Sequence, residues 1–201
     1  LFLEMLDNLA SEKDKDPLGI FASRLATMAC KAAVKGNHQM STQEANMLID
    51  ELKNIARNNG IVGAGGAGFP AYAKMTEKAD TVILNCVECE PLLKLHRQLL
   101  ATHTEEIIQM LDEVRESFGA KEAVIGIKSE YVTTIKAIEE VIGDFPNVRI
   151  CALKAAYPMG DEVVLIYEAT GRVIKPGGLP IDENVVVYNV ETMYNLYRAV
   201  H

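Results

Sequence analysis

The segment GIVGAGGAGFPAYAK, residues 60–74, has the residue types of a phosphate-binding loop. Five of its fifteen residues are glycine, and glycine lets a ligand approach the backbone closely. These glycines include a G-x-G-x-x-G spacing with one extra glycine, formed by Gly63, Gly65, Gly66 and Gly68. Successive backbone N–H groups in such a loop can bind an anion. Lys74 follows closely enough to add a positive charge to a bound phosphate.

The spacing alone is weak evidence for a ligand, because the usual dinucleotide-binding loop follows a strong strand. Here only Ile61 and Val62 precede the loop, so a flexible glycine turn is one alternative. A solvated surface lysine is the alternative for Lys74. The length of the glycine-rich string favours the phosphate-binding interpretation.

Polar side chains follow an apolar run at residues 81–85. They are Asn85, Glu88 and Glu90. Ligands bind at the carboxyl ends of strands in open α/β sheets, and an asparagine can both donate to and accept from a ring edge such as that of isoalloxazine. Solvated acids are the alternative for the two glutamates.

Two later groups of polar residues also lie between a predicted strand and the helix that follows it. Glu162 begins a predicted helix, where an acid also favours the helix dipole. Asn189 ends an apolar run and Thr192 falls in the turn after it, so capping of the next helix would also explain both residues. We include all three among the candidate site residues.

Cys86 and Cys89 form a C-x-x-C pair. A zinc or iron–sulfur site needs about four ligands, and Cys30, Cys151 or a histidine would have to supply the others. No second paired motif is present and the four histidines are scattered, so we predict no metal site. A redox dithiol, or two small residues in a ligand loop, are the alternatives.

From residue 60 onward, short apolar runs alternate with helical periodicity. The runs suit strands buried on both faces and cover residues 81–85, 122–127, 147–153 and 184–189. Helices are expected at residues 102–118, 130–142, 161–170 and 191–200. This alternation predicts an α/β fold with a parallel sheet flanked by helices.

Residues 1–58 have helical periodicity and no strand signal. Asp16 and Pro17 are typical of a helix start, and Ser41 with Glu44 forms a capping box before a second helix. We therefore expect an all-helical segment over residues 1–58 and the α/β domain over residues 59–201.

The composition is that of a globular protein, with 49% hydrophobic and 24% charged residues. The net charge of -8, without a basic stripe, argues against a large nucleic-acid interface. No apolar stretch reaches the roughly 18 residues of a membrane span, and the first residues lack the features of a signal peptide. The four cysteines do not suggest a disulfide framework, so we expect a cytoplasmic location.

Several strings after residue 55 resemble one family. They are GIVGAGGAGFP, NCVECEP, YPMGDE and GGLPIDENVVVYNVETMYN. They are similar to the nucleotide-binding domain of the Rnf-complex C subunit, to its relative PrdC, which is associated with proline reductase, and more distantly to the flavin subunit of respiratory complex I. The resemblance implies a Rossmann-like fold, an FMN site and NADH oxidation by hydride transfer to the flavin.

The resemblance also implies roles for individual residues. Those that hold FMN would be Gly63, Gly65, Gly66 and Lys74 at the phosphate, Asn85 and Glu88 at the ring, and Asn189 and Thr192 at the tail. Those near NADH would be Phe69, Glu90 and Glu162, of which Phe69 and Glu162 would act in catalysis. Relatives of this kind continue into iron–sulfur regions, so we expect the domain to be truncated before them and to pass electrons to an iron–sulfur partner.

Residues 1–53 resemble a different family. The string IFASRLATMACKAAVKGNHQMSTQEANMLIDEL is similar to the C-terminal region of the mismatch-repair protein MutL, which implies dimerisation through the N-terminal helices. The companion metal-binding motifs of that family are missing. The chain would then be a fusion of two unrelated parts.

We thus expect an FMN-dependent NADH-oxidising domain, cytoplasmic or peripheral to a membrane complex. A DNA-repair fragment related to MutL and a nucleotide-binding module without turnover are the alternative functions.

Overall fold

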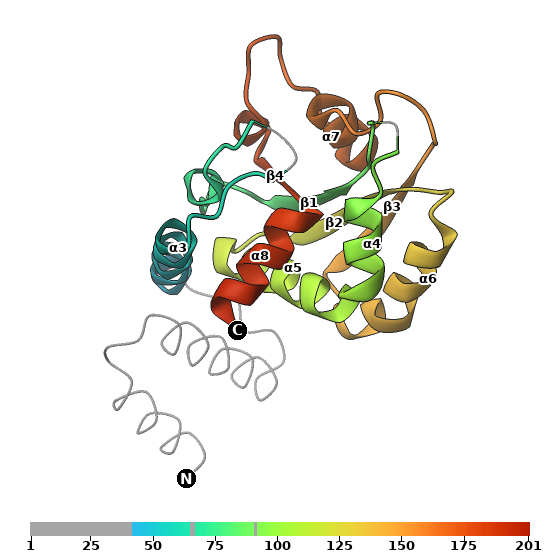
Figure 1. Cartoon of the computed structure of the whole chain (residues 1–201). Coiled ribbons are helices and arrows are strands. Elements are labelled where there is room, and N and C mark those ends of the chain that lie inside the picture. Colours follow the sequence, from blue (N-terminus) through green and yellow to red (C-terminus); the bar gives the residue numbers. More distant parts are fainter. Residues whose placement is uncertain (1–41, 65–66, 91) are drawn as a thin grey trace.

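The structure is a computed structural model that describes residues 42–64, 67–90 and 92–201. Within these residues a four-stranded parallel sheet forms the centre of an α/β domain (Figure 1). The strands are β1 (Thr81–Cys86), β2 (Glu122–Lys128), β3 (Val148–Leu153) and β4 (Val185–Asn189). The predicted fold class and the four predicted strands are confirmed.

The order of the strands across the sheet is β3-β2-β1-β4. The chain runs outward from β1 through β2 to β3, and then returns to place β4 on the other side of β1. Asn85 and Asn189 are partners in the last register pair of β1 and β4. Because the connections leave these two strands in opposite directions, a crevice is expected at their carboxyl ends.

Both faces of the sheet are buried. Val82 and Leu84 of β1 belong to a large core cluster on one face, and Ile83 belongs to a smaller cluster on the other. Strands covered on both faces have near-continuous apolar sequences, which is why these runs were recognisable in the sequence.

Helices cover the two faces unequally. The larger cluster includes side chains from α3 (Thr42–Asn58), α4 (Leu95–Thr102), α5 (Thr104–Phe118), α6 (Val132–Val141) and α8 (Val190–Val200). The smaller cluster is covered by α7 (Glu162–Thr170). Three short 3-10 helices complete the described part, namely η1 (Ala71–Lys74), η2 (Ile142–Asp144) and η3 (Pro180–Glu183).

The helix predicted to begin at Thr102 begins instead at Thr104. The hydroxyl of Thr102 donates to the carbonyl oxygen of Gln98 at 2.9 Å, so Thr102 ends α4 and does not cap α5. The predicted start of this helix at residue 102 is therefore wrong. The sequence analysis missed α4 altogether.

α3 packs on the α/β domain. Leu48, Leu52 and Ile55 are almost fully buried and belong to the same core cluster as the sheet. The sequence analysis assigned these residues to a separate segment ending at residue 58, and the core contacts place the second half of α3 with the domain. The predicted helix starts at Asp16 and Ser41 lie outside the described residues.

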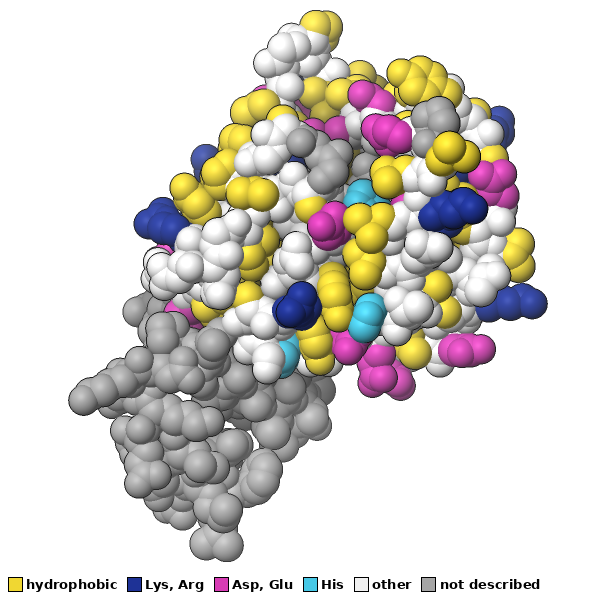
Figure 2. All heavy atoms as spheres, in the orientation of Figure 1, with side chains coloured by type: hydrophobic (Ala, Val, Ile, Leu, Met, Phe, Trp, Pro, Cys, Tyr) yellow, Lys and Arg dark blue, Asp and Glu magenta, His cyan; other side chains and the backbone are white. Residues whose placement is uncertain are grey.

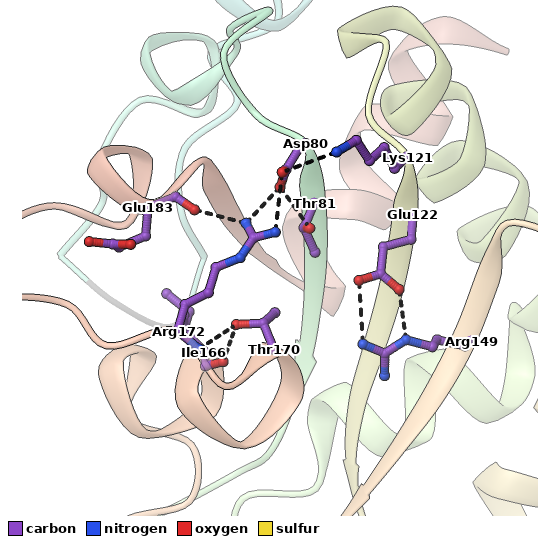
Figure 3. Close-up of polar contacts among 9 residues, drawn as sticks. All are labelled: Asp80, Thr81, Lys121, Glu122, Arg149, Ile166, Thr170, Arg172 and Glu183. Carbon is purple, nitrogen blue, oxygen red and sulfur yellow. Dashed lines mark hydrogen bonds and ion pairs between the residues drawn. The ribbon is translucent and has the colours of Figure 1, made fainter.

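An ion pair fixes the loop between α7 and β4 at the amino end of the sheet (Figure 3). The guanidinium of Arg172 donates to both carboxylate oxygens of Asp80, at 2.6 and 3.2 Å, and to the carbonyl oxygen of Glu183 at 2.8 Å. Burial opposes ionisation of Asp80. Hydrogen bonds from Arg172 and Thr81, with the charges of Arg172 and Lys121, outweigh it and hold the pKa of Asp80 below its ordinary value.

We expect Arg172→Gln to lower the free energy of unfolding by about 1–2 kcal/mol at neutral pH, because three charge-assisted hydrogen bonds are lost. The folded pKa of Asp80 is lowered, so its contribution is present above the unfolded pKa of about 4 and is lost as the pH falls through the folded value. Urea unfolding between pH 7 and pH 3 measures both effects.

Glu122→Gln is the matched control, because Glu122 pairs with Arg149 on the exposed surface (Figure 3). Exposed pairs contribute about 0.2–1 kcal/mol, so this variant should lose less stability. Equal losses from the two variants would contradict a special role for Asp80 and Arg172.

Candidate functional site

A cavity of about 260 Å³ lies at the carboxyl ends of β1 and β4. Its lining residues are Gly63, Phe69, Ala71, Lys74, Asn85, Glu162, Val187, Tyr188, Asn189 and Thr192. They come from the glycine loop, the end of β1, the start of α7 and the junction of β4 with α8. Seven of them were predicted as site residues from the sequence, namely Gly63, Phe69, Lys74, Asn85, Glu162, Asn189 and Thr192.

The glycine loop is attached to the start of α8, beside the end of β4 (Figure 1). The hydroxyl of Thr192 accepts from the backbone N–H of Ala64 at 3.0 Å and donates to the carbonyl oxygen of Val62 at 3.2 Å. The side-chain amide of Asn189 donates to the carbonyl oxygen of Ala64, and its oxygen accepts from the backbone N–H of Thr192. Asn189 thereby caps α8 and holds the loop at the same time.

The base of the glycine loop is closed by backbone hydrogen bonds. The N–H of Gly63 donates to the carbonyl oxygen of Phe69 at 2.7 Å, and Val62 forms an isolated antiparallel bridge with Pro70. A Cβ at Gly63 would lie 3.4 Å from the same carbonyl oxygen. Gly68 has a φ of +69°, which a residue with a side chain rarely adopts. A Cβ at Gly63 would thus be in ordinary van der Waals contact, and it is the backbone conformation at Gly68 that requires glycine.

Lys74 ends η1 and points into the cavity. Its Nζ donates to the carbonyl oxygen of Val187 at 3.1 Å and lies 3.4 Å from Oε1 of Glu162. Because β4 is an edge strand, carbonyl oxygens on its outer side have no partner strand, and one of them accepts from Lys74. The ammonium is thus held at the cavity wall.

Glu162 is placed by the loop that precedes α7. Asp161 caps the helix by accepting from the N–H groups of Val163 and Val164 at 3.0 and 3.3 Å. Glu162 is the first residue of the helix, and its side chain is not the one that caps it.

Gly160 packs directly against the chain leaving β1. Its carbonyl oxygen accepts from the side-chain amide of Asn85 at 3.0 Å, and its N–H donates to the sulfur of Cys89 at 3.2 Å. A Cβ at Gly160 would lie 2.1 Å from the carbonyl oxygen of Val87. Gly160 was not among the predicted site residues. Its role is to let the loop carrying Glu162 approach the end of β1.

Glu88 lies outside the cavity lining. It is 4% exposed, and its Oε1 accepts from the backbone N–H of His96 in the first turn of α4 at 2.8 Å. Its other oxygen lies 3.7 Å from Nε of Arg97, whose guanidinium stacks on the ring of Tyr131. The structure gives Glu88 the role of anchoring α4. Contact of Glu88 with a flavin stays a prediction.

Two of the other predicted residues, Glu90 and Gly68, also lie off the cavity wall. Glu90 is exposed and does not line the cavity. Gly65 and Gly66 lie outside the described residues, so their predicted contact with a phosphate stays a prediction. Gly68 shapes the loop without lining the cavity.

Cys86 and Cys89 are free cysteines and form no disulfide with each other. Burial raises the pKa of the Cys86 thiol, and the nearby carboxylate of Glu88 raises it further. A thiol that stays protonated is a poor nucleophile and metal ligand. Among the described residues, no group of three or more His, Cys, Asp and Glu side chains is arranged to hold a metal ion.

A more open cleft of about 430 Å³ lies on the other side of the glycine loop. Its walls are Asn59, Gly60, Ile61, Val62, Ala64, Glu191, Asn195, Arg198 and Ala199. None of the predicted site residues that the structure describes lines this cleft, and its described lining residues include no aromatic side chain. We therefore take the smaller cavity, where the predicted residues meet, as the candidate site.

The candidate cavity fits a ligand that has both an aromatic ring and a phosphate. Lys74 supplies an ammonium donor paired with Glu162, Asn85 and Asn189 end the neighbouring strands β1 and β4, and the side chain of Phe69 is 51% exposed. Glycines allow a close approach on one side. The fold is that of an open α/β sheet with a cavity where the strand order reverses, which is the usual place for a ligand in such sheets.

A family model described as the Nuo51 FMN-binding domain matches residues 56–198. The chain belongs to this family, and the predicted class of FMN-binding domain is confirmed.

Similar proteins agree with the family. The cobalamin reductase PduS of Citrobacter freundii is 40% identical over 149 residues, which are 74% of this chain and 33% of the relative. The C subunit of the Na(+)-translocating ferredoxin:NAD(+) oxidoreductase complex of Acetobacterium woodii is 36% identical over 159 residues, 77% of this chain and 36% of the relative. The chain thus spans about a third of these curated relatives.

Among solved structures, an NAD+-reducing [NiFe]-hydrogenase in the air-oxidized state superposes with a TM-score of 0.65 and 26% identity. The match covers 76% of this chain and 30% of the hydrogenase chain. The comparisons give no support to the predicted resemblance of residues 1–53 to MutL. The family match begins after that segment, at residue 56.

We expect Gly160→Ala to displace the loop that carries Glu162. The added methyl group would meet the backbone of Val87 at 2.1 Å, and a backbone atom cannot rotate away as a side chain can. Overpacking of this kind costs about 1–3 kcal/mol. Thermal unfolding should show the loss, and Gly143→Ala is the control because its Cβ would meet nothing within 4 Å. Equal stability of the two variants would rule out this packing constraint.

Proposed function

We propose that this domain binds FMN in the cavity between β1 and β4 and accepts electrons from NADH. The observation that carries the proposal is the convergence of seven residues, predicted separately from the sequence, on one cavity at the reversal of the strand order. The family match supports an FMN electron-transfer domain. The names of the relatives, a cobalamin reductase and an NAD(+) oxidoreductase subunit, support a redox role.

Different residues of the cavity would bind different parts of FMN. Lys74 and the backbone of the glycine loop, from Gly63 onward, would bind the phosphate. Asn85 would bind the polar edge of the ring, and Asn189 with Thr192 would bind the tail. The hydrogen bonds of Asn189 and Thr192 to Ala64 place both side chains beside the glycine loop, which supports this assignment.

The nicotinamide nucleotide would enter from the exposed side of the cavity. Phe69 is half-exposed beside the glycine loop and would stack on a nicotinamide or adenine ring. Glu162 and Glu90 would accept hydrogen bonds from ribose hydroxyls. A carboxylate at this place would repel the additional phosphate of NADPH, so NADH should be the preferred donor. FMN, when bound, supplies the acceptor for the hydride.

The electrons would leave to an iron–sulfur partner, in an assembly of the Rnf type or one related to PduS. A role beside proline reductase, as in PrdC, stays a prediction. No helix among the described residues is long and apolar enough to cross a membrane. Basic side chains on the face seen in Figure 2 are dispersed among acidic and uncharged ones, so we propose nucleotides and redox proteins as partners.

We expect saturable binding of FMN, measured by quenching of flavin fluorescence. Gly63→Val should weaken binding by at least tenfold, because Gly63 lines the cavity and a valine side chain would add bulk at its wall. Gly143→Val, on the surface of η2, is the control. Unchanged affinity in Gly63→Val would place the flavin elsewhere.

The FMN-loaded protein should lose its absorbance near 450 nm on anaerobic addition of NADH, and more slowly with NADPH. Glu162→Gln should slow the bleaching while FMN stays bound. If FMN binds but NADH never bleaches it, the domain is a flavin-binding module without NADH oxidation of its own.

A further inference from the structure

The cavity wall contains one positive and one negative side chain. Among its described lining residues, Lys74 and Glu162 are the charged ones, and they face one another with Nζ and Oε1 3.4 Å apart. The two residues are 88 positions apart in the sequence. Their charges cancel within the cavity, so the lysine does not present a free positive charge to a ligand.

The ammonium group of Lys74 has more N–H donors than it has acceptors among the described residues. An ammonium group has three N–H donors, and two acceptors are in place, the carbonyl oxygen of Val187 and the carboxylate of Glu162. The carbonyl belongs to the fixed edge of β4. The carboxylate belongs to a side chain that is 41% exposed, so it is the partner that can move.

Glu162 can leave Lys74 without disturbing α7. The N-cap of this helix is Asp161, whose carboxylate accepts from two backbone N–H groups. Rotation of the Glu162 side chain therefore breaks one ion pair and no capping bond. A phosphate that approached Lys74 would meet the carboxylate of Glu162 first, and two anions beside one ammonium repel each other.

From this arrangement we infer that the carboxylate of Glu162 competes with the phosphate of the ligand for Lys74. This competition lowers the affinity of the cavity for that phosphate. The inference rests on the proposed function, since it takes FMN as the phosphate-bearing ligand. Glu162 has to turn away from Lys74 when the phosphate binds. The pair thereby keeps a strongly basic spot from standing open to inorganic phosphate and other small anions.

The test compares FMN with riboflavin, which has the same ring and tail without the phosphate. Dissociation constants are measured by flavin fluorescence for the parent protein and for Glu162→Gln. We expect FMN to bind about threefold more tightly to the variant, the size of a partly exposed ion pair, with the affinity for riboflavin unchanged. At 1 M salt, where charges are screened within about 3 Å, the gain should disappear.

Two variants serve as controls. Glu168→Gln removes the same charge from an exposed position of the same helix and should leave both affinities as they are. In a Lys74→Gln background, Glu162→Gln should no longer tighten FMN binding, because the competitor then has nothing to compete for.

The outcomes separate this inference from the proposed function. If neither flavin binds the parent protein, the proposed function fails. If both flavins bind and Glu162→Gln leaves FMN affinity unchanged or weakens it, competition is excluded. Equal tightening of FMN and riboflavin also excludes it, because Glu162 would then act on the ring and not on the phosphate.

Discussion

The attachment of the glycine loop to the start of α8 is the constraint on which the rest of the site depends. One hydroxyl, that of Thr192, binds both an N–H and a carbonyl oxygen of a loop 128 to 130 positions earlier in the chain. Asn189 adds a further bond and caps α8. These bonds hold the loop against the end of β4, and the hydroxyl of Tyr188 adds a bond to the carbonyl oxygen of Ala71 in η1, the short helix from which Lys74 reaches the carbonyl oxygen of Val187.

The opposite wall of the cavity depends on Gly160, which has no side chain. Gly160 brings the start of α7 against the end of β1, where Asn85 binds its carbonyl oxygen. Glu162 thereby reaches Lys74 from the other side of the cavity. The two walls thus meet at a partly exposed ion pair. The core beneath, built on both faces of the sheet, keeps the walls in place.

Much of this could be predicted from the sequence, for physical reasons. Strands buried on both faces gave continuous apolar runs, and polar residues directly after them, such as Asn85 and Asn189, lie at one edge of a parallel sheet. α4 was missed because no glycine or proline separates it from α5. The chain breaks at His103, where φ is -125° and ψ is 41°. The anchoring role of Glu88 was missed for the same reason, since its partner is the first turn of α4. The pairing of Lys74 with Glu162 depends on how the loops meet in space, which spacing in the sequence does not show.

The most direct measurement of the central claim is a crystal structure of the protein with FMN bound. The account predicts electron density for the flavin in the cavity between the ends of β1 and β4, with the phosphate beside Lys74 and the glycine loop, and with Glu162 turned away from the lysine. Flavin density in the other cleft, against Asn59 and Arg198, would contradict it.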